Sequence, residues 1–146
     1  MTAEDIPQAA EIERLCFSEP WSENSYRSCF ARDGEQSWFY AAVPEAEPDK
    51  LLGIIGLSRM GEDGEISNVA VLPEFRRNGM ARALLETALR EGSGRHGLQD
   101  FTLEVRAGNE AAICLYESEG FAEEGRRPDF YRNPTEDARI LWRRRL

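Results

Sequence analysis

One stretch, residues 65–105, constrains the fold more than any other part of the sequence. Residues 65–71 end in the apolar run Val69, Ala70 and Val71 and are typical of a strand, as are residues 101–105. Between them, apolar residues recur at intervals of three and four from Gly79 to a Gly-Ser-Gly sequence at residues 92–94, which indicates a helix. Two strands joined through one crossover helix have to run parallel, so we expect a parallel pair with this helix over one face.

The other patterns place helices and antiparallel strands around that unit. We expect a first helix from Asp5, a break at residues 18–20 and a second helix capped by Ser22. Strand-like runs at residues 38–43, 51–57 and 65–71 follow in succession and predict an antiparallel meander. A helix capped by Asn109 and ended by Gly120 comes next, and residues 121–122 and 139–142 are the last strand candidates. The sequence therefore predicts one domain over residues 1–146 of the α/β (α+β) class, with helices on both faces of a central mixed, mostly antiparallel sheet in three layers.

Composition and charge exclude several classes of protein. The 146 residues are 41% hydrophobic and 31% charged, the balance of a globular domain with an apolar core. No apolar run approaches the roughly 18 residues of a membrane span, and the start of the chain lacks the features of a secretory signal, so we expect a cytoplasmic protein without membrane contact. A net charge of −9 disfavours direct nucleic-acid binding. Three cysteines without a CxxC pair and a single histidine predict neither a disulfide framework nor a metal site.

The loop that opens the central helix has the composition of an anion-binding site. It follows the pattern Arg-x-x-Gly-x-Ala and consists of Arg76, Arg77, Asn78, Gly79, Met80 and Ala81. A helix N-terminus leaves backbone N–H groups unpaired and carries partial positive charge, and a glycine there lets a phosphate come close. The pattern matches neither a Walker loop nor the Gly-x-Gly-x-x-Gly dinucleotide fingerprint. An ordinary helix start with a pair of surface arginines is the alternative interpretation.

Two further segments carry side chains suited to proton transfer. Glu104 lies inside an otherwise apolar strand, where it either points to solvent on the alternate face or serves as a general base. Asn109 and Tyr116 are seven residues apart on one helix and share a face. Tyr116 is either a core residue or a general acid that protonates a departing thiolate, and the plainest reading of Asn109 is a helix cap.

In this order along the chain, these residues resemble the GNAT (Gcn5-related) superfamily of N-acetyltransferases, from about residue 3 to residue 142. The resemblance rests on residues 69–71, on the Arg-x-x-Gly-x-Ala loop, and on Asn109 followed by Tyr116-x-x-x-Gly-Phe. Within the superfamily the chain is similar to the RimI type, the ribosomal-protein-alanine N-acetyltransferases, through residues 20–22 (Pro-Trp-Ser) and 103–106 (Leu-Glu-Val-Arg). The resemblance implies direct transfer of the acetyl group of acetyl-CoA, without a metal, to a protein N-terminal α-amine. The implied acceptor is the N-terminal alanine of small-subunit ribosomal protein eighteen.

The resemblance also implies roles for matching residues. Glu104 would be the general base, acting through a water, and Tyr116 the general acid on the CoA sulfur. Trp21 and Tyr131 would border the acceptor entrance, although Trp21 is also suited to anchor the turn between the first two helices in the core. Backbone or side-chain groups that would hold acetyl-CoA come from Val69, Ala70, Val71, Arg76, Arg77, Asn78, Gly79, Met80, Ala81, Arg82 and Asn109. In this set, residues 69–71 and Asn109 would contact the pantetheine arm, and the amides of residues 76–82 would hold the pyrophosphate.

Two features depart from the family pattern. The first helix begins almost at Met1, so the strand that usually precedes it is missing or truncated, and the bare sheet edge favours a monomer or a weak dimer. Three consecutive arginines at residues 143–145 are unusual in so acidic a chain, and we assign them no function.

Other functions remain open from the residues alone. An acetyltransferase acting on lysine side chains or small-molecule amines would carry the same motifs. A non-catalytic acyl-CoA-binding module is a further alternative, against which the presence of both Glu104 and Tyr116 argues. An acyl-enzyme route through Cys114 is disfavoured because no histidine lies near it in the sequence.

Overall fold

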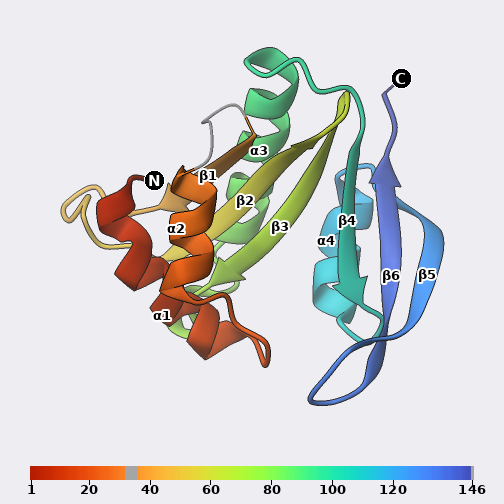
Figure 1. The fold of residues 1–146 in the computed structure, drawn as a ribbon, viewed down its shortest axis with the longest axis horizontal. Helices are drawn as coiled ribbons and strands as arrows, with labels where there is room; N and C mark the ends of the chain where they lie inside the picture. Colours follow the sequence, from red (N-terminus) through yellow and green to blue (C-terminus); the bar gives the residue numbers. More distant parts are fainter. Residues whose placement is uncertain (32–35, 146) are drawn as a thin grey trace.

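The computed structural model describes residues 1–31 and 36–145, and its centre is a six-stranded sheet (Figure 1). The strands lie in the order β1-β2-β3-β4-β6-β5, with bounds β1 (Ser37–Ala42), β2 (Gly53–Met60), β3 (Asp63–Val71), β4 (Phe101–Arg106), β5 (Ala122–Tyr131) and β6 (Glu136–Arg143). All neighbours pair antiparallel except β3 and β4, which are parallel. The expected meander and the parallel crossover are both confirmed.

Helices cover both faces of this sheet, which confirms the three-layer prediction. The 3₁₀ turn η1 (Ala3–Asp5) leads into α1 (Ile6–Cys16), and α1 and α2 (Glu23–Ala31) pack on one face. The short turn η2 (Pro73–Phe75) follows β3, and α3 (Met80–Gly94) and α4 (Glu110–Ser118) pack on the other face. The sheet separates two hydrophobic cores, and consecutive residues of β2 point to different ones. Ile54 belongs to the core beneath α1 and α2, whereas Ile55 belongs to the core beneath α3 and α4.

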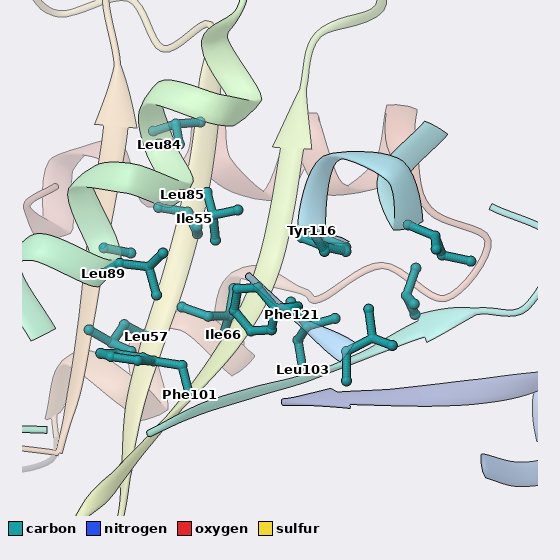
Figure 2. Close-up of a cluster of buried hydrophobic side chains, with 14 of the residues drawn as sticks. Ile55, Leu57, Ile66, Leu84, Leu85, Leu89, Phe101, Leu103, Tyr116 and Phe121 are labelled. Carbon is teal, nitrogen blue, oxygen red and sulfur yellow. The ribbon is translucent and has the colours of Figure 1, made fainter. Parts of the chain in front are cut away.

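The core beneath α3 and α4 fixes where α3 begins and ends. Figure 2 shows side chains from one helix, three strands and the α4 region meeting in this core, among them Leu84, Leu85, Leu89, Ile55, Leu57, Ile66, Phe101, Leu103, Tyr116 and Phe121. Each fully buried side chain of this kind contributes roughly 1.5–3 kcal/mol. At its far end α3 comes so close to β4 that a Cβ at Gly92 would lie 2.7 Å from the Phe101 ring. Packing therefore holds the N-terminus of α3 beside the end of β3.

The sheet splits between its two parallel strands. β3 and β4 pair at only two positions, Gly64 with Phe101 and Glu65 with Thr102, whereas β4 pairs with β6 at six. Beyond Glu65 the two strands diverge (Figure 1). The second half of β3, which includes residues 69–71, consequently lies on the open side of this split.

A β-bulge lies in the same half of β3. β2 and β3 pair at Ile54–Ala70 and next at Gly56–Ser67, so that Asn68 and Val69 together oppose Ile55. Asn68 has a positive φ of 55°, a conformation that asparagine tolerates better than most residues. A bulge turns backbone groups out of the regular ladder, so this segment of β3 differs from an ordinary edge strand.

The ends of the chain differ in part from the expectations. The strand β5 has ten residues, whereas the sequence predicted only residues 121–122. The prediction was too short because exposed polar residues, Gly125 and Pro128 conceal the strand pattern. As expected, no strand lies outside β1 among the described residues, although the Met1 ammonium donates to the Phe39 carbonyl at 3.2 Å. Of the three C-terminal arginines, Arg144 is ion-paired with Glu124 at 2.6 Å and with Asp100 at 3.2 Å. No helix in the described ranges is long and apolar enough to cross a membrane.

Candidate active site

The N-terminus of α3 is an open cluster of backbone donors. Gly79 precedes the helix with a φ of 78°, and a Cβ placed there would meet no atom of the described residues within 4 Å. Arg77 also has a positive φ, of 68°. The first helical bond runs from Ala83 N to Gly79 O at 3.0 Å, which leaves the earlier amides of residues 80–82 without an intrahelical acceptor. This geometry fits a phosphate group, which would occupy the space over Gly79.

Three exposed side chains of this loop are bonded to other groups of the protein. Arg76 donates through Nε to the Val71 carbonyl at 3.1 Å and through Nη2 to the Cys16 thiol at 3.4 Å. Asn78 donates to the Phe75 carbonyl at 3.3 Å, and Arg82 is ion-paired with Glu119 across to α4 at 2.6 Å. The amides, rather than the guanidinium groups of Arg76 and Arg82, are therefore the groups available to an anion here.

Val69, Ala70 and Val71 lead from the bulge of β3 to this loop. Ala70 pairs with Ile54 and Val71 with Gly53, while Val69 lies in the bulge. The Val71 carbonyl is already engaged by Arg76, and the Cys16 thiol lies 3.5 Å from it. Of the predicted backbone contacts to the pantetheine arm, the one through the Val71 oxygen would have to compete with Arg76.

Glu104 lies on the face of β4 opposite to α3 and α4. Its neighbours Leu103 and Val105 are both buried beneath those helices, so its own side chain is directed to the other face, where it is 24% exposed. Arg127 of β5 forms an ion pair with it at 3.3 Å. Burial, and secondarily the negative charge of Glu104, raise the pKa of Glu65 on β3. Glu104 thus belongs to a group of charged side chains from β3, β4 and β5.

Two tyrosines connect this charged group to α4. Burial raises the pKa of Tyr131 to about 12, and the Glu104 charge adds to the effect. Burial, and secondarily Tyr131, raise the pKa of Tyr116 to about 12 as well. Tyr116 is buried and packs edge to face on Phe121 at 6.0 Å. Burial is thus the main cause of both raised pKa values, and a smaller charge effect relates the members of the Glu104–Tyr131–Tyr116 set.

Arg106 connects the turn between α1 and α2 to the turn between β5 and β6. Its Nη2 donates to the Ser18 hydroxyl at 2.8 Å and to the Arg132 carbonyl at 2.7 Å, and its guanidinium stacks on the Tyr131 ring at 4.6 Å. The Arg132 amide in turn donates to Glu19 at 2.9 Å. The turn between α1 and α2 is thereby fixed to the turn between β5 and β6.

Trp21 and Asn109 lie in surroundings that also serve the fold. The Trp21 ring contacts the rings of Tyr26 at 5.3 Å and Phe39 at 6.3 Å, which are the contacts of a core anchor, while Tyr131 is the predicted acceptor-side residue that adjoins Glu104. Asn109 caps α4 by accepting from Ala112 N at 3.3 Å, as its position predicts.

A depression of about 580 Å³ lies beside the C-terminal arginines, and one of about 270 Å³ lies between β1 and His96. Neither includes Glu104 or Tyr116 among its lining residues. In the described part of the chain, no group of three or more His, Cys, Asp or Glu side chains could hold a metal ion.

Sequence reasoning missed several residues that the structure brings to this region. Arg127 is ion-paired with Glu104, whose charge helps to raise the pKa of Glu65, and no motif marks either residue. Asn68 occupies the bulge, and Glu13 of α1 is bonded to it at 2.9 Å. Only Glu13 left a signal, because it is a charged residue at a position where the helical period calls for an apolar one.

The chain is similar to known acetyltransferases in sequence and in structure. Residues 6–121 match the model of the acetyltransferase (GNAT) family. The chain is 36% identical over 145 residues to the ribosomal protein bS18-alanine N-acetyltransferase of Salmonella typhimurium, covering 97% of this chain and 92% of the relative. It is similar to the crystal structure of the ribosomal-protein-S18-alanine N-acetyltransferase from Escherichia coli, with a TM-score of 0.85 at 34% identity over 97% of this chain and 88% of that one. It is also similar to a chain in the crystal structure of the NatC complex bound to Gag peptide and CoA, with a TM-score of 0.83 at 25% identity over 99% and 93%.

Proposed function

The chain belongs to the GNAT family of acetyltransferases, which makes it an acetyl-CoA-dependent N-acetyltransferase, and we propose that its acceptor is the N-terminal α-amine of a protein. The most specific form of the proposal is the N-terminal alanine of ribosomal protein bS18, the acceptor named for relatives of similar length at 36% and 37% identity. It includes the cytoplasm as the place of action, since ribosomal proteins are made there.

The observation that supports the proposal is the presence of three features that acetyl transfer from acetyl-CoA requires. These are the open donor cluster before α3, the bulged half of β3, and the Glu104–Tyr131–Tyr116 set. The donor cluster suits the pyrophosphate of acetyl-CoA, and the β3 edge suits its pantetheine arm. Asn109, at the start of α4, would contact the same arm.

The proposed roles of the protein groups follow from their chemistry. Acetyl-CoA supplies the acetyl group as an activated thioester. A free α-amine has a pKa of about 7.7–8.0, so Glu104, acting through a water, would take its proton at neutral pH. Backbone N–H groups near Val71 would stabilise the charge that develops on the carbonyl oxygen.

The leaving sulfur needs a proton at the end of the step. As the new N–C bond forms, the C–S bond breaks and its electron pair leaves with the sulfur. Tyr116, which like any phenol is protonated at physiological pH and whose pKa burial raises further to about 12, would donate its proton to that sulfur. The acceptor would enter beside Tyr131 and the turn that carries Trp21.

Thermal shift and peptide acetylation test the proposal in two steps. Acetyl-CoA at roughly 100 times its Kd contributes about 2.7 kcal/mol to stability, which should raise the Tm by several degrees. A peptide with the N-terminal alanine sequence of bS18 should then gain one acetyl group by mass spectrometry. An N-terminally blocked peptide with an internal lysine, and a polyamine, should gain none.

The same panel separates the alternatives. Preferential acetylation of the lysine peptide or the polyamine would show that the acceptor is a side-chain or small-molecule amine instead of an N-terminal α-amine. Stabilisation by acetyl-CoA without CoA release on any acceptor would identify a non-catalytic acyl-CoA-binding module and refute the proposal.

A further inference from the structure

A buried carboxylate connects α1 to the bulge of β3. Glu13 is 1% exposed, and its Oε1 accepts hydrogen bonds from Asn68 Nδ2 at 2.9 Å and from the Trp21 amide at 3.2 Å. Its Oε2 is buried without a hydrogen-bond partner among the described residues, as are the Asn68 Oδ1 and the Tyr26 hydroxyl. One oxygen atom therefore joins the bulge to the turn between α1 and α2.

Burying the Glu13 carboxylate lowers the stability of the fold. Burial raises the pKa of Glu13, and the hydrogen bonds from Asn68 and Trp21 lower it only in part. A buried charge with few partners costs more than a packed apolar side chain of similar volume. The residue is therefore poorly explained by stability alone, and its two hydrogen bonds are the specific contribution that an apolar residue would lack.

Asn68, to which Glu13 is hydrogen-bonded, directly precedes residues 69–71, the proposed contact of the pantetheine arm. Asn68 has a φ of 55° and, with Val69, forms the bulge opposite Ile55. The bulge is pressed against β2, because a Cβ at Gly56 would lie 2.7 Å from the Ser67 hydroxyl and 3.2 Å from Asn68 Oδ1. Contact with Gly56 limits the bulge on one side, and the bond to Glu13 fixes the Asn68 side chain from the helix layer.

We propose that Glu13 is a positioning residue for acetyl transfer: through Asn68 it fixes the backbone of residues 68–71 toward the thioester, and through the Trp21 amide it fixes the acceptor-side turn to the same atom. The inference rests on the proposed function. It assigns to α1 a part in the reaction, although Glu13 itself does not touch the reacting atoms.

Two substitutions of Glu13 separate hydrogen bonding from charge. Glu13→Met keeps the volume and removes both acceptor bonds, so kcat should fall by at least about tenfold while the acetyl-CoA KM changes little. Glu13→Gln keeps a carbonyl oxygen that can take both bonds, so it should restore most of kcat. Glu11→Met is the matched control, because Glu11 is an exposed residue of the same helix whose ion pair is with Arg14.

A double-substitution cycle locates the effect at Asn68. Asn68→Gly tolerates the positive φ and removes the amide donor. If Glu13 acts through Asn68, the two changes together should lower kcat by clearly less than the product of their separate effects. An effect equal to that product would mean that the residues act independently and would overturn the inference.

Hydrogen exchange tests the positioning without any acceptor or cofactor. In the free protein, amides of residues 66–71 should exchange faster in Glu13→Met than in the wild type, and Glu13→Gln should reverse the change. Unchanged exchange, or an equal loss of kcat in both variants, would overturn the inference. Failure of the wild type to acetylate any acceptor would instead refute the proposed function, and exchange would still decide whether Glu13 fixes the bulge.

Discussion

At the scale of single residues, the proposed base and acid lie on opposite faces of the sheet. Glu104 lies on the face away from α3 and α4, whereas Tyr116 belongs to the core beneath them. Tyr131 links the two electrostatically, since Glu104 raises its pKa and it raises that of Tyr116. A substrate between them would meet a proton acceptor on one side and a donor on the other.

Removing the carboxylate of Glu104 should slow the reaction in a pH-dependent way. Glu104→Gln should lower kcat/KM by about a hundredfold near pH 6.5, where an α-amine is mostly protonated and needs a base. The loss should shrink toward pH 9, where the amine is already neutral. A pH–rate profile measures this, with Glu123→Gln as an exposed control on β5, and a loss independent of pH would remove Glu104 from the role of base.

Removing the hydroxyl of Tyr116 should affect the chemical step alone. Tyr116→Phe keeps the ring contact with Phe121, so kcat should fall about a hundredfold with little change in the acetyl-CoA KM. Steady-state kinetics test it, with Tyr40→Phe, a half-buried tyrosine of β1, as the control. Wild-type kcat in Tyr116→Phe would exclude it as the acid.

At the scale of elements, two backbone irregularities define the candidate site. The positive φ of Gly79 opens the N-terminus of α3, and the bulge at Asn68 takes the second half of β3 out of its regular ladder. Asn68 lies three residues before the end of β3, Gly79 directly precedes α3, and packing around Gly92 holds α3 against β4. The candidate site is therefore formed by the last residues of β3 and the first residues of α3.

A methyl group at Gly79 should weaken acetyl-CoA binding more than it weakens the fold. Gly79→Ala strains a residue with a φ of 78° by about 1 kcal/mol and places a Cβ in the space proposed for a phosphate. Calorimetry should show at least about a tenfold higher Kd. Gly61→Ala carries the same strain at a φ of 65° in the β2–β3 turn, also in open space, and should lower the Tm alike while leaving the Kd unchanged.

At the scale of the whole molecule, the split sheet is held together by contacts that cross it. Packing of α3 and α4 closes one face, and Arg106 ties the α1–α2 turn to the β5–β6 turn at the other. The buried phenol of Tyr116 and the partly buried phenol of Tyr131 lie within this arrangement, so its stability depends on their staying neutral.

Stability should consequently decrease at alkaline pH. The folded pKa of Tyr116, about 12, lies above the value of roughly 10 for an unfolded tyrosine, so its contribution is present below pH 10 and is lost as the pH rises toward 12. The loss is on the order of 2 kcal/mol. Urea unfolding at pH 9 and pH 11.5 should show a smaller decrease for Tyr116→Phe than for the wild type, and equal decreases would contradict the buried phenol.

The sequence by itself determined the order of elements, the parallel crossover, the glycine at the start of α3 and the cap at Asn109, because periodicity, turn residues and capping are local properties. It could not determine the length of β5, whose exposed polar residues have no apolar period. Nor could it indicate that Arg127 pairs with Glu104, or that Glu13 bonds Asn68 across 55 residues. Those contacts depend on how β4 and β5 pair with β6 and on how α1 packs over β3, and packing of distant segments is decided only in the tertiary structure.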